Sequence, residues 1–346
     1  MIKEETMSEQ ITIIGKSKLN PTAVIDSPYG MIRQDPAINA LSRISSRTGA
    51  EMDPFLGTGL IRTKNGNTDI QVLIAEYGNV QLKQSTSKLE RLLTICFTEA
   101  GSNCSTVSIS LKDAMYALGL KNKQKARTTI KKDLEALYNI TLKVIKNHSS
   151  KKQDYLEFRI CDVWCIKNGI ISMNFSAPIF KHLQNCPVMP YPKELLRIES
   201  NQQKNPYSFY IGDKITELAK LNQHDNNTQK LKEYFIVSVN NLLKLCMSNG
   251  MPTYEEVMTS DRAVSRKIVE PLEKNLNALE NIFSWEYCHA KGLPLTDDEL
   301  EADISYKEYT QRYIKVIMGN NYPHEEWDKK KAERKKKNIK RANKIK

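Results

Sequence analysis

The stretch Val107–Tyr138, VSISLKDAMYALGLKNKQKARTTIKKDLEALY, decides the fold of the first half of the chain. Its first residues predict a short strand, and Ser110 is a favourable N-cap for a helix over Leu111–Leu118. Gly119 stands where a helix commonly ends, because glycine adopts the left-handed backbone that closes the last turn. A second helix is predicted from about Asn122 to Tyr138. Two helices joined by a tight turn that contains glycine indicate a helix-turn-helix.

The sequence around this stretch supplies a helical pattern before it and strands after it. Alternating strand patterns follow at Ile140–Lys146 and Tyr155–Ile166, separated by the polar loop His148–Asp154. Asn168-Gly169 is the strongest two-residue hairpin signal in the chain, with a returning strand over Ile170–Phe175. Helix, short strand, two helices and a hairpin is the element order of a winged helix. We expect the loop at residues 148–154 to be its wing.

A weaker copy of the same order follows in the second half of the chain. Ile236-Val237-Ser238-Val239 has the role of Val107–Ser110, a strand that leads into a capped helix. A helix opens at Pro206 before it, and a helical pattern over residues 254–279 comes after it, kinked or restarted at Pro271. Strand-like or mixed patterns then cover residues 283–289 and 306–318. A second winged helix is therefore predicted.

The charge of the chain is positive and uneven. Among 346 residues, 52 are Lys or Arg and 40 are Asp or Glu, so the net charge is +12 at pH 7. From Asp328 onward eleven basic residues stand against two acids, so this tail carries +9 of the charge. The excess favours an anionic partner such as nucleic acid or an acidic membrane surface. A charge block of this kind also occurs as a solvated tail, so it does not decide the function.

Composition also indicates where the protein works. No apolar run approaches the ~18 residues that span a bilayer, and the first residues show no secretory signal. Seven cysteines, an odd number in a chain of this length, do not indicate a disulfide framework. The expected location is the reducing cytoplasm.

The predicted helix Asn122–Tyr138 has two contrasting faces at 3.6 residues per turn. Apolar side chains share one face: Ala126, Ile130, Leu134 and Leu137. The opposite face carries hydrogen-bond donors, and no acid lies between Lys121 and Lys132. A helix that docks in a major groove needs this division. A solvated surface helix with a charged outer face is the alternative interpretation.

We expect Gln124, Arg127 and Thr128 to read bases, because glutamine can bond adenine and arginine can bond guanine in bidentate fashion. The phosphate candidates of this unit are lysines of the same helix and of the expected wing: Lys121, Lys125, Lys131, Lys132, Lys146, Lys151 and Lys152. In the second unit, the phosphate candidates are the cations on the helical face away from the apolar stripe: Arg262, Arg266 and Lys267.

The predicted fold class is α+β and helix-rich, with two winged-helix domains in tandem. We expect a mobile N-terminal arm over residues 1–66, because this segment is rich in Ser, Thr, Gly, Pro and Asn and shows no sustained period. A first, DNA-binding winged-helix domain is expected over residues 67–190 and a second winged-helix-like domain over residues 191–325. The basic tail covers residues 326–346.

The sequence contains no pattern typical of a catalytic or metal site. The five histidines lie far apart, and none forms a His-x-His pair. Cys161 and Cys165 have no second pair to complete a zinc site, and we expect them to pack as small hydrophobic residues. We therefore expect no catalytic residue, no metal and no cofactor. A two-metal site assembled from carboxylates distant in sequence is the alternative.

Besides the helix-turn-helix, six short segments carry a family resemblance: Lys83–Leu89 (KQSTSKL), Arg159–Asp162 (RICD), Lys167–Ile171 (KNGII), Pro187–Pro192 (PVMPYP), Pro252–Val257 (PTYEEV) and Trp285–His289 (WEYCH). With them the chain resembles the replication initiator proteins of plasmids and related mobile elements from Gram-positive bacteria. The resemblance covers roughly residues 70–325, and its segments indicate kinship rather than catalytic motifs.

The resemblance implies tandem winged helices that bind repeated duplex sites at an origin, help to open it and recruit host replication factors. The missing His-x-His pair argues against a nicking, rolling-circle mode. The expected partner is double-stranded DNA with origin repeats. Host helicase or initiator proteins and a second copy of the chain are further candidates, and no membrane is expected. Two alternatives are a winged-helix transcriptional regulator without an initiation role and a metal-dependent DNA nickase.

Overall fold

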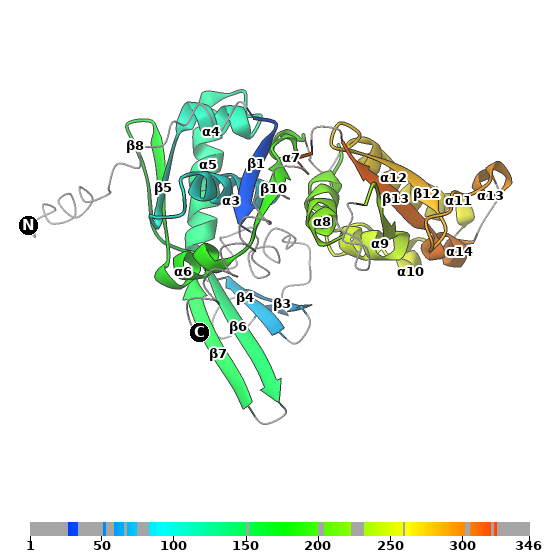
Figure 1. Ribbon diagram of the computed structural model, residues 1–346, viewed down its shortest axis with the longest axis horizontal. Helices are drawn as coiled ribbons and strands as arrows, with labels where there is room; N and C mark the ends of the chain where they lie inside the picture. Colours follow the sequence, from blue (N-terminus) through cyan, green and yellow to red (C-terminus); the bar gives the residue numbers. More distant parts are fainter. Residues whose placement is uncertain are drawn as a thin grey trace, which may run out of the picture. The chain divides into compact units, whose positions relative to one another are not determined.

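A computed structural model describes residues 27–33, 51–52, 59–65, 68–74, 83–149, 152–199, 204–222, 232–258, 260–301, 305–319 and 322–323. The chain divides into two compact units. One contains residues 1–27 and 32–187, and the other contains residues 28–31 and 188–346. Each unit combines helices with small sheets, in agreement with the predicted α+β class (Figure 1).

The first unit is built around the predicted pair of helices. Helix α3 (Gln84–Glu99) is followed by strand β5 (Thr106–Ser110), helix α4 (Leu111–Ala117) and helix α5 (Lys123–Asn139). The hydroxyl of Ser110 caps α4, because it accepts a hydrogen bond from the Asp113 backbone N–H at 3.0 Å. Gly119 follows α4 with a φ of 67°, as expected for the glycine that closes a helix. The capping signals read from the sequence are confirmed here.

The three-stranded sheet of this unit pairs β5 with a hairpin that is distant in sequence. Strands β8 (Cys161–Lys167) and β9 (Ile170–Phe175) are antiparallel, and the sheet order is β5-β9-β8. The predicted hairpin turn is confirmed at Asn168-Gly169, whose φ angles are 53° and 74°. The Leu111 N–H donates a hydrogen bond to the Gly169 carbonyl at 2.7 Å. This bond ties the turn to the start of α4.

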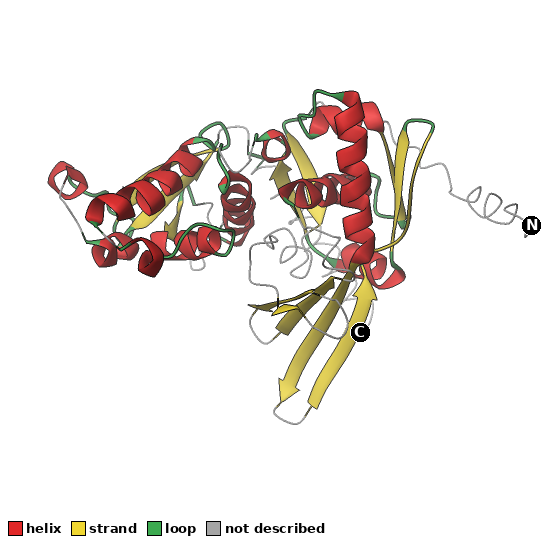
Figure 2. Ribbon diagram, turned by 180° about the vertical axis from the view of Figure 1, so that it is seen from behind, coloured by secondary structure: helices red, strands yellow, loops and turns green. Residues whose placement is uncertain are grey.

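The expected wing at residues 148–154 is wrong, because the strands beside that loop belong to a different sheet. Strands β6 (Ile140–Ser149) and β7 (Lys152–Arg159) form an antiparallel hairpin in which β6 pairs with β4 (Thr68–Ile74), not with β5. The full order of this five-stranded sheet is β2-β3-β4-β6-β7. The hairpin β6–β7 runs away from the end of α5 in both ribbon views (Figures 1 and 2).

The predicted single strand at residues 155–166 is two strands that lie in these two sheets. The break is at Ile160, where Ile160 and Cys161 are both 0% exposed and the alternation of buried and exposed residues is interrupted. The Ile160 N–H donates to the Ile140 carbonyl at 3.4 Å, and the Ile160 carbonyl accepts from the Ser176 N–H at 3.1 Å. Two adjacent apolar residues thus mark the point where the chain leaves one sheet and enters the other.

The described part of the expected N-terminal arm contains three strands, which the absence of a sustained sequence period did not predict. They are β1 (Tyr29–Arg33), β2 (Glu51–Met52) and β3 (Gly59–Asn65), and β3 pairs with β4. Ile32 is buried, and the Arg33 guanidinium donates to Ser102 Oγ at 2.8 Å and to the Gln184 carbonyl at 2.7 Å.

The second unit repeats the element order of the first. Helix α8 (Ser208–Leu221) precedes β11 (Phe235–Ser238) and α9 (Val239–Met247). Strands β12 (Phe283–Cys288) and β13 (Tyr313–Met318) complete an antiparallel sheet of order β11-β13-β12. In both units the strand before the helix pair bonds to the last strand of the sheet. Before α8, this unit also contains β10 (Val188–Pro192), which pairs with β1, and the short helix α7 (Glu194–Arg197).

The long helical pattern of the second unit is divided into several pieces. Helices α10 (Tyr254–Val257) and α11 (Asp261–Val264) lead into a π-helical turn, η3 (Ser265–Val269), and then into α12 (Glu270–Asn277). The backbone stays helical from Asp261 to Asn277, and Pro271 directly follows the π-helical turn, so the helix is distorted near this proline rather than restarted. The apolar stripe continues through the π-helical turn, and its side chains are buried: Ile268, Leu272 and Leu276.

The hairpin turn gives a test of the first unit. The Gly169→Ala variant should lower the free energy of unfolding by about 1 kcal/mol, because alanine is strained at this φ. No other atom lies within 4 Å of the added methyl group, so backbone strain is the whole cost. Urea denaturation measures the change. Asn168→Gly is the control, since it relieves rather than creates strain; equal stability of G169A and wild type would contradict the turn geometry.

Candidate nucleic-acid interface

Helix α5 presents the two faces that its sequence predicted. The predicted apolar stripe is at most 2% exposed: Ala126, Ile130, Leu134 and Leu137. The polar face is exposed to solvent: Lys121, Lys123, Gln124, Lys125, Arg127, Thr128, Lys131 and Lys132. In Figure 2, α5 is the long helix that runs down the first unit, and no other element lies in front of it. The division into a buried and a cationic face is confirmed; which side chain meets a base or a phosphate stays a prediction.

The start of α5 is fixed by its own cap. Asn122 precedes the helix, and its Oδ1 accepts a hydrogen bond from the Lys125 backbone N–H at 2.9 Å. Thr128 Oγ1 donates to the Gln124 carbonyl at 3.1 Å, which is a bond within the helix. These local bonds hold the first two turns in place without using the Gln124 amide or the lysine ammonium groups.

The cations of α5 are not neutralised by nearby carboxylates in the described part of the chain. Lys131 has an ion pair with Glu135, with 3.6 Å between Nζ and Oε1, and both side chains are exposed. A pair of this kind contributes little and is screened by salt. The other acid of this segment, Asp133, is buried and turned toward α3. The exposed face of α5 therefore keeps its positive charge.

A polar hollow of about 540 Å³ lies beside this face, where α3 and α5 begin. Three lysines line it, from just before α3 and from the first three turns of α5: Lys83, Lys125 and Lys132. The remaining lining residues carry hydroxyl, amide or carboxyl groups: Ser85, Asn122, Gln124, Thr128, Thr129 and Asp133. The predicted base readers Gln124 and Thr128 thus share one hollow with two predicted phosphate contacts, whereas Arg127 is not among the lining residues.

Asp133 ties the two helices together at the floor of the hollow. Its Oδ1 accepts hydrogen bonds from Thr86 Oγ1 at 2.7 Å and from Ser85 Oγ at 2.9 Å, both in the first turn of α3. Desolvation raises the pKa of this carboxyl from 3.8 to about 6, although the two hydroxyl bonds and Lys83 lower it. The Asp133 side chain is 4% exposed, and this burial removes the water that would stabilise its charged form.

The expected wing lysines lie in the five-stranded sheet or outside the described residues. Lys146 is in β6 opposite Asp154 of β7, and Lys152 is the first residue of β7. Lys151 lies outside the described residues. The turn that the structure places next to α4 is Asn168-Gly169, and exposed Lys167 precedes it. Lys83, Ser85 and Lys167 were not predicted from the sequence. A basic residue directly before the Asn-Gly turn was the available signal for Lys167, and no local signal marked Lys83 or Ser85.

In the second unit the three predicted cations are also exposed. Arg262 is in α11, and Arg266 and Lys267 are in the π-helical turn. The apolar residues predicted behind them are buried: Val264, Ile268 and Leu272. A π-helical turn widens the backbone at this point, and such turns recur at functional sites.

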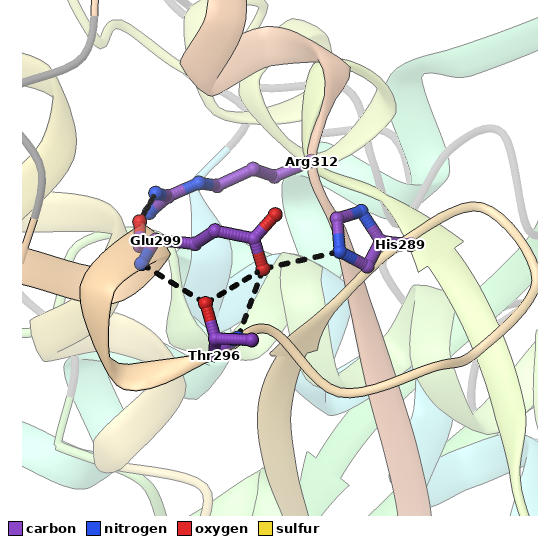
Figure 3. A network of polar contacts seen from close by, with 4 residues as sticks. All are labelled: His289, Thr296, Glu299 and Arg312. Carbon is purple, nitrogen blue, oxygen red and sulfur yellow. Dashed lines mark hydrogen bonds and ion pairs between the residues drawn. The ribbon is translucent and has the colours of Figure 1, made fainter.

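The connection between β12 and β13 differs from the short turn between β8 and β9. It contains α13 (Asp297–Glu301) and α14 (Tyr306–Gln311), and the first turn of α13 is acidic. Glu299 holds this connection together (Figure 3). Its carboxylate accepts a hydrogen bond from the Thr296 N–H at 2.9 Å and lies 3.3 Å from His289 Nε2. The Arg312 guanidinium donates to the backbone carbonyl of Glu299. This connection presents negative charge, which does not suit contact with phosphate.

The described residues hold neither a cluster of metal ligands nor a membrane-spanning helix. No group of three or more His, Cys, Asp or Glu side chains that could hold a metal ion occurs there. Cys161 is buried, and desolvation raises the pKa of its thiol to about 12, as for a cysteine that packs as a small hydrophobic residue. None of the helices in this part of the chain is long and apolar enough to cross a bilayer.

Comparison with known proteins gives structural neighbours of low similarity. No family profile matches the chain, and no curated protein matches it. A crystal structure of domains 2 and 3 of RctB has a TM-score of 0.43 and 10% identity, covering 80% of this chain and 94% of that chain. A second RctB structure of domains 2–3 has a TM-score of 0.41 and 9% identity, covering 82% and 98%. Scores of this size do not establish a shared fold, so the fold described here rests on its own strand order and contacts.

The buried carboxyl of Asp133 gives a test by pH. Because its pKa is raised, the folded protein binds the proton more tightly than the unfolded chain, so stability falls as pH rises from 3.8 to about 6. The Asp133→Asn variant keeps an acceptor for Ser85 and Thr86 and should remove this loss of stability. At pH values above 6, its free energy of unfolding should exceed that of the wild type by up to about 3 kcal/mol. Urea denaturation at pH 4 to 8 measures it.

Glu135→Gln is the matched control, because it removes a solvent-accessible carboxylate from the same helix. It should follow the pH dependence of the wild type. If D133N instead lost stability equally at every pH, the carboxylate would be stabilising in its charged form, and the desolvation argument would be wrong.

Proposed function

We propose that this protein binds double-stranded DNA through two winged helices and acts as a replication initiator at repeated origin sites, without catalysing a reaction itself. The observation that carries DNA binding is the exposed cationic face of α5 opposite a buried stripe, on which Lys131 has a solvent-exposed and therefore weak ion pair with Glu135. Electrostatic attraction to phosphate supplies non-specific affinity, and side chains on the same helix supply specificity.

The dimensions of α5 support its use in a major groove. Its 17 residues make a rod about 25 Å long, and a helix with side chains is about 10–12 Å across. The major groove is about 12 Å wide, which admits one such helix. In this arrangement Arg127 reaches base edges, while the lysines on either side meet the strands that border the groove.

The repeated element order supports a second recognition unit. Helix α9 with the helical segments α11, η3 and α12 occupies the place of α4 and α5, and its exposed face carries Arg262, Arg266 and Lys267. Two such units in one chain suit tandem sites in the DNA. The acidic connection between β12 and β13 takes no part in phosphate binding in this proposal.

The initiation role rests on the family resemblance of the sequence, and DNA binding alone also suits a transcriptional regulator. Direct repeats in an AT-rich region beside the gene favour an initiator, and a single palindrome over a promoter favours a regulator. A nickase would show metal-dependent cleavage of origin DNA. Intact binding without such cleavage supports the non-catalytic role.

Substitutions in α5 separate base reading from phosphate binding. Arg127→Ala should cost about 1–3 kcal/mol of binding free energy at particular base pairs, so that the DNA sequence preferred by the protein becomes less defined. Lys125→Ala should weaken binding to all duplexes alike, because a phosphate contact carries no sequence information. Selection of bound duplexes from a random pool, followed by affinity measurements, distinguishes the two. Equal losses on every sequence for both variants would contradict the assignment of Arg127.

Replication itself is tested with a marker plasmid that carries the gene and its flanking DNA and no other origin. The wild-type plasmid should be maintained, and the same plasmid with Arg127→Ala should be lost, because origin recognition fails. Lys181→Ala in α6 (Ala177–Asn185) removes an exposed charge from another helix, and the plasmid with this change should be maintained. Loss of the wild-type plasmid together with sequence-specific repression of a promoter would favour the regulator.

A further inference from the structure

The hollow where α3 and α5 begin combines positive charge, donors and an open side. We propose that it is a trough for the sugar–phosphate backbone of one DNA strand, with Lys83, Lys125 and Lys132 as its cations. This inference rests on the proposed function and deepens it, because it separates a backbone-holding side of α5 from the base-reading side.

The three ammonium groups come from separate places and reach one space. Lys83 precedes α3, whereas Lys125 and Lys132 lie two turns apart on α5. All three side chains are exposed, so they approach a ligand without first breaking an ion pair with a described residue. Lysine binds phosphate as a point charge, and three in one hollow suit a polyanion.

Uncharged donors line the space between these lysines. Thr128 and Thr129 supply hydroxyl groups, and Asn122 and Gln124 supply amides. Asn122 uses its Oδ1 to cap α5, which leaves the amide nitrogen as a donor. Hydroxyl and amide donors of this kind commonly contact phosphate oxygens and fix the register of a protein on DNA.

Both helices begin at the hollow, so their dipoles add to its positive potential. Lys83 is the N-cap residue of α3, which has 16 residues, and Asn122 is the N-cap residue of α5, which has 17. The N-terminal end of a helix carries about half a positive charge and favours anions. The dipoles support a site that the lysines already define.

Asp133 is the single acid among the lining residues, and two hydroxyl groups of the first turn of α3 donate to its Oδ1. Ser85 and Thr86 both donate to Oδ1, so this carboxylate is held at the floor beside the α3 N-terminus. Its negative charge repels a small anion bound at the floor more strongly than it repels a DNA strand that lies across the open side. The arrangement favours the DNA backbone over free phosphate.

The length of the hollow agrees with that choice. Its lining on α5 runs from Asn122 to Asp133, about 16 Å along the helix axis. Each DNA strand carries one charge per about 3.4 Å of axis, so a segment of backbone fills such a trough and one inorganic phosphate does not. Gln124 and Thr128 then lie on the backbone side, and Arg127 is left as the base reader.

The test compares the full-length wild type with Lys83→Gln and with Lys181→Gln, an exposed charge on α6 that serves as the matched control. The probe is a random-sequence duplex, and the slope of log affinity against log salt concentration is measured. K83Q should reduce the slope by about 0.9 per lost phosphate contact and weaken binding several-fold, whereas K181Q should match the wild type. Asp133→Asn should tighten binding several-fold at low salt.

Each outcome decides between the claims. If the wild type binds the duplex and K83Q behaves as K181Q does, the trough is wrong and the proposed function stands. If the wild type binds no duplex, the proposed function fails and the trough fails with it. If millimolar inorganic phosphate displaces the duplex from the wild type but not from K83Q, the hollow is a site for a small anion rather than for the backbone.

Discussion

The apolar stripe of α5 packs against α3 and β8, and this burial turns the opposite, cationic face of the helix toward solvent. Ile130, Leu134 and Leu137 are each at most 2% exposed, and burying three such side chains contributes on the order of 5–9 kcal/mol. Turning the helix about its axis would place lysines in this core, at a cost that no contact on the other side repays. The position of the charged face is therefore a consequence of packing.

The same packing creates the features that sequence periodicity could not show. The cap at Ser110 and the turn at Asn168-Gly169 depend on residues that are close together in the chain, so they were predicted correctly, whereas Asn122 was predicted as the start of its helix and is the cap. The hollow depends on Ser85 and Asp133, which are 48 residues apart in the chain and meet only in the folded unit. No local pattern marks such a pair, so the sequence alone does not assign Lys83 to a site.

The wing was misplaced for a related reason. The alternation at residues 140–146 correctly predicts a strand, but it does not say which strand is the partner. Thr68 pairs with Lys146 in β4 and β6, far apart in sequence, while the strand beside β5 is β9. The adjacent apolar residues Ile160 and Cys161 were the one local sign that the chain changes sheets there.

The two units share a strand order, but the second has an acidic helical connection where the first has a short turn. The same arrangement of strands and helices therefore presents a different surface in each unit.

The most direct measurement is the reactivity of individual lysines toward an acetylating reagent, with and without duplex DNA, read by mass spectrometry on the full-length protein. If α5 and the hollow beside it hold DNA, the duplex protects Lys83, Lys125 and Lys132, while Lys181 reacts at an unchanged rate. If those three lysines react equally fast in the presence of a duplex that the protein demonstrably binds, DNA contacts another surface and the account is wrong.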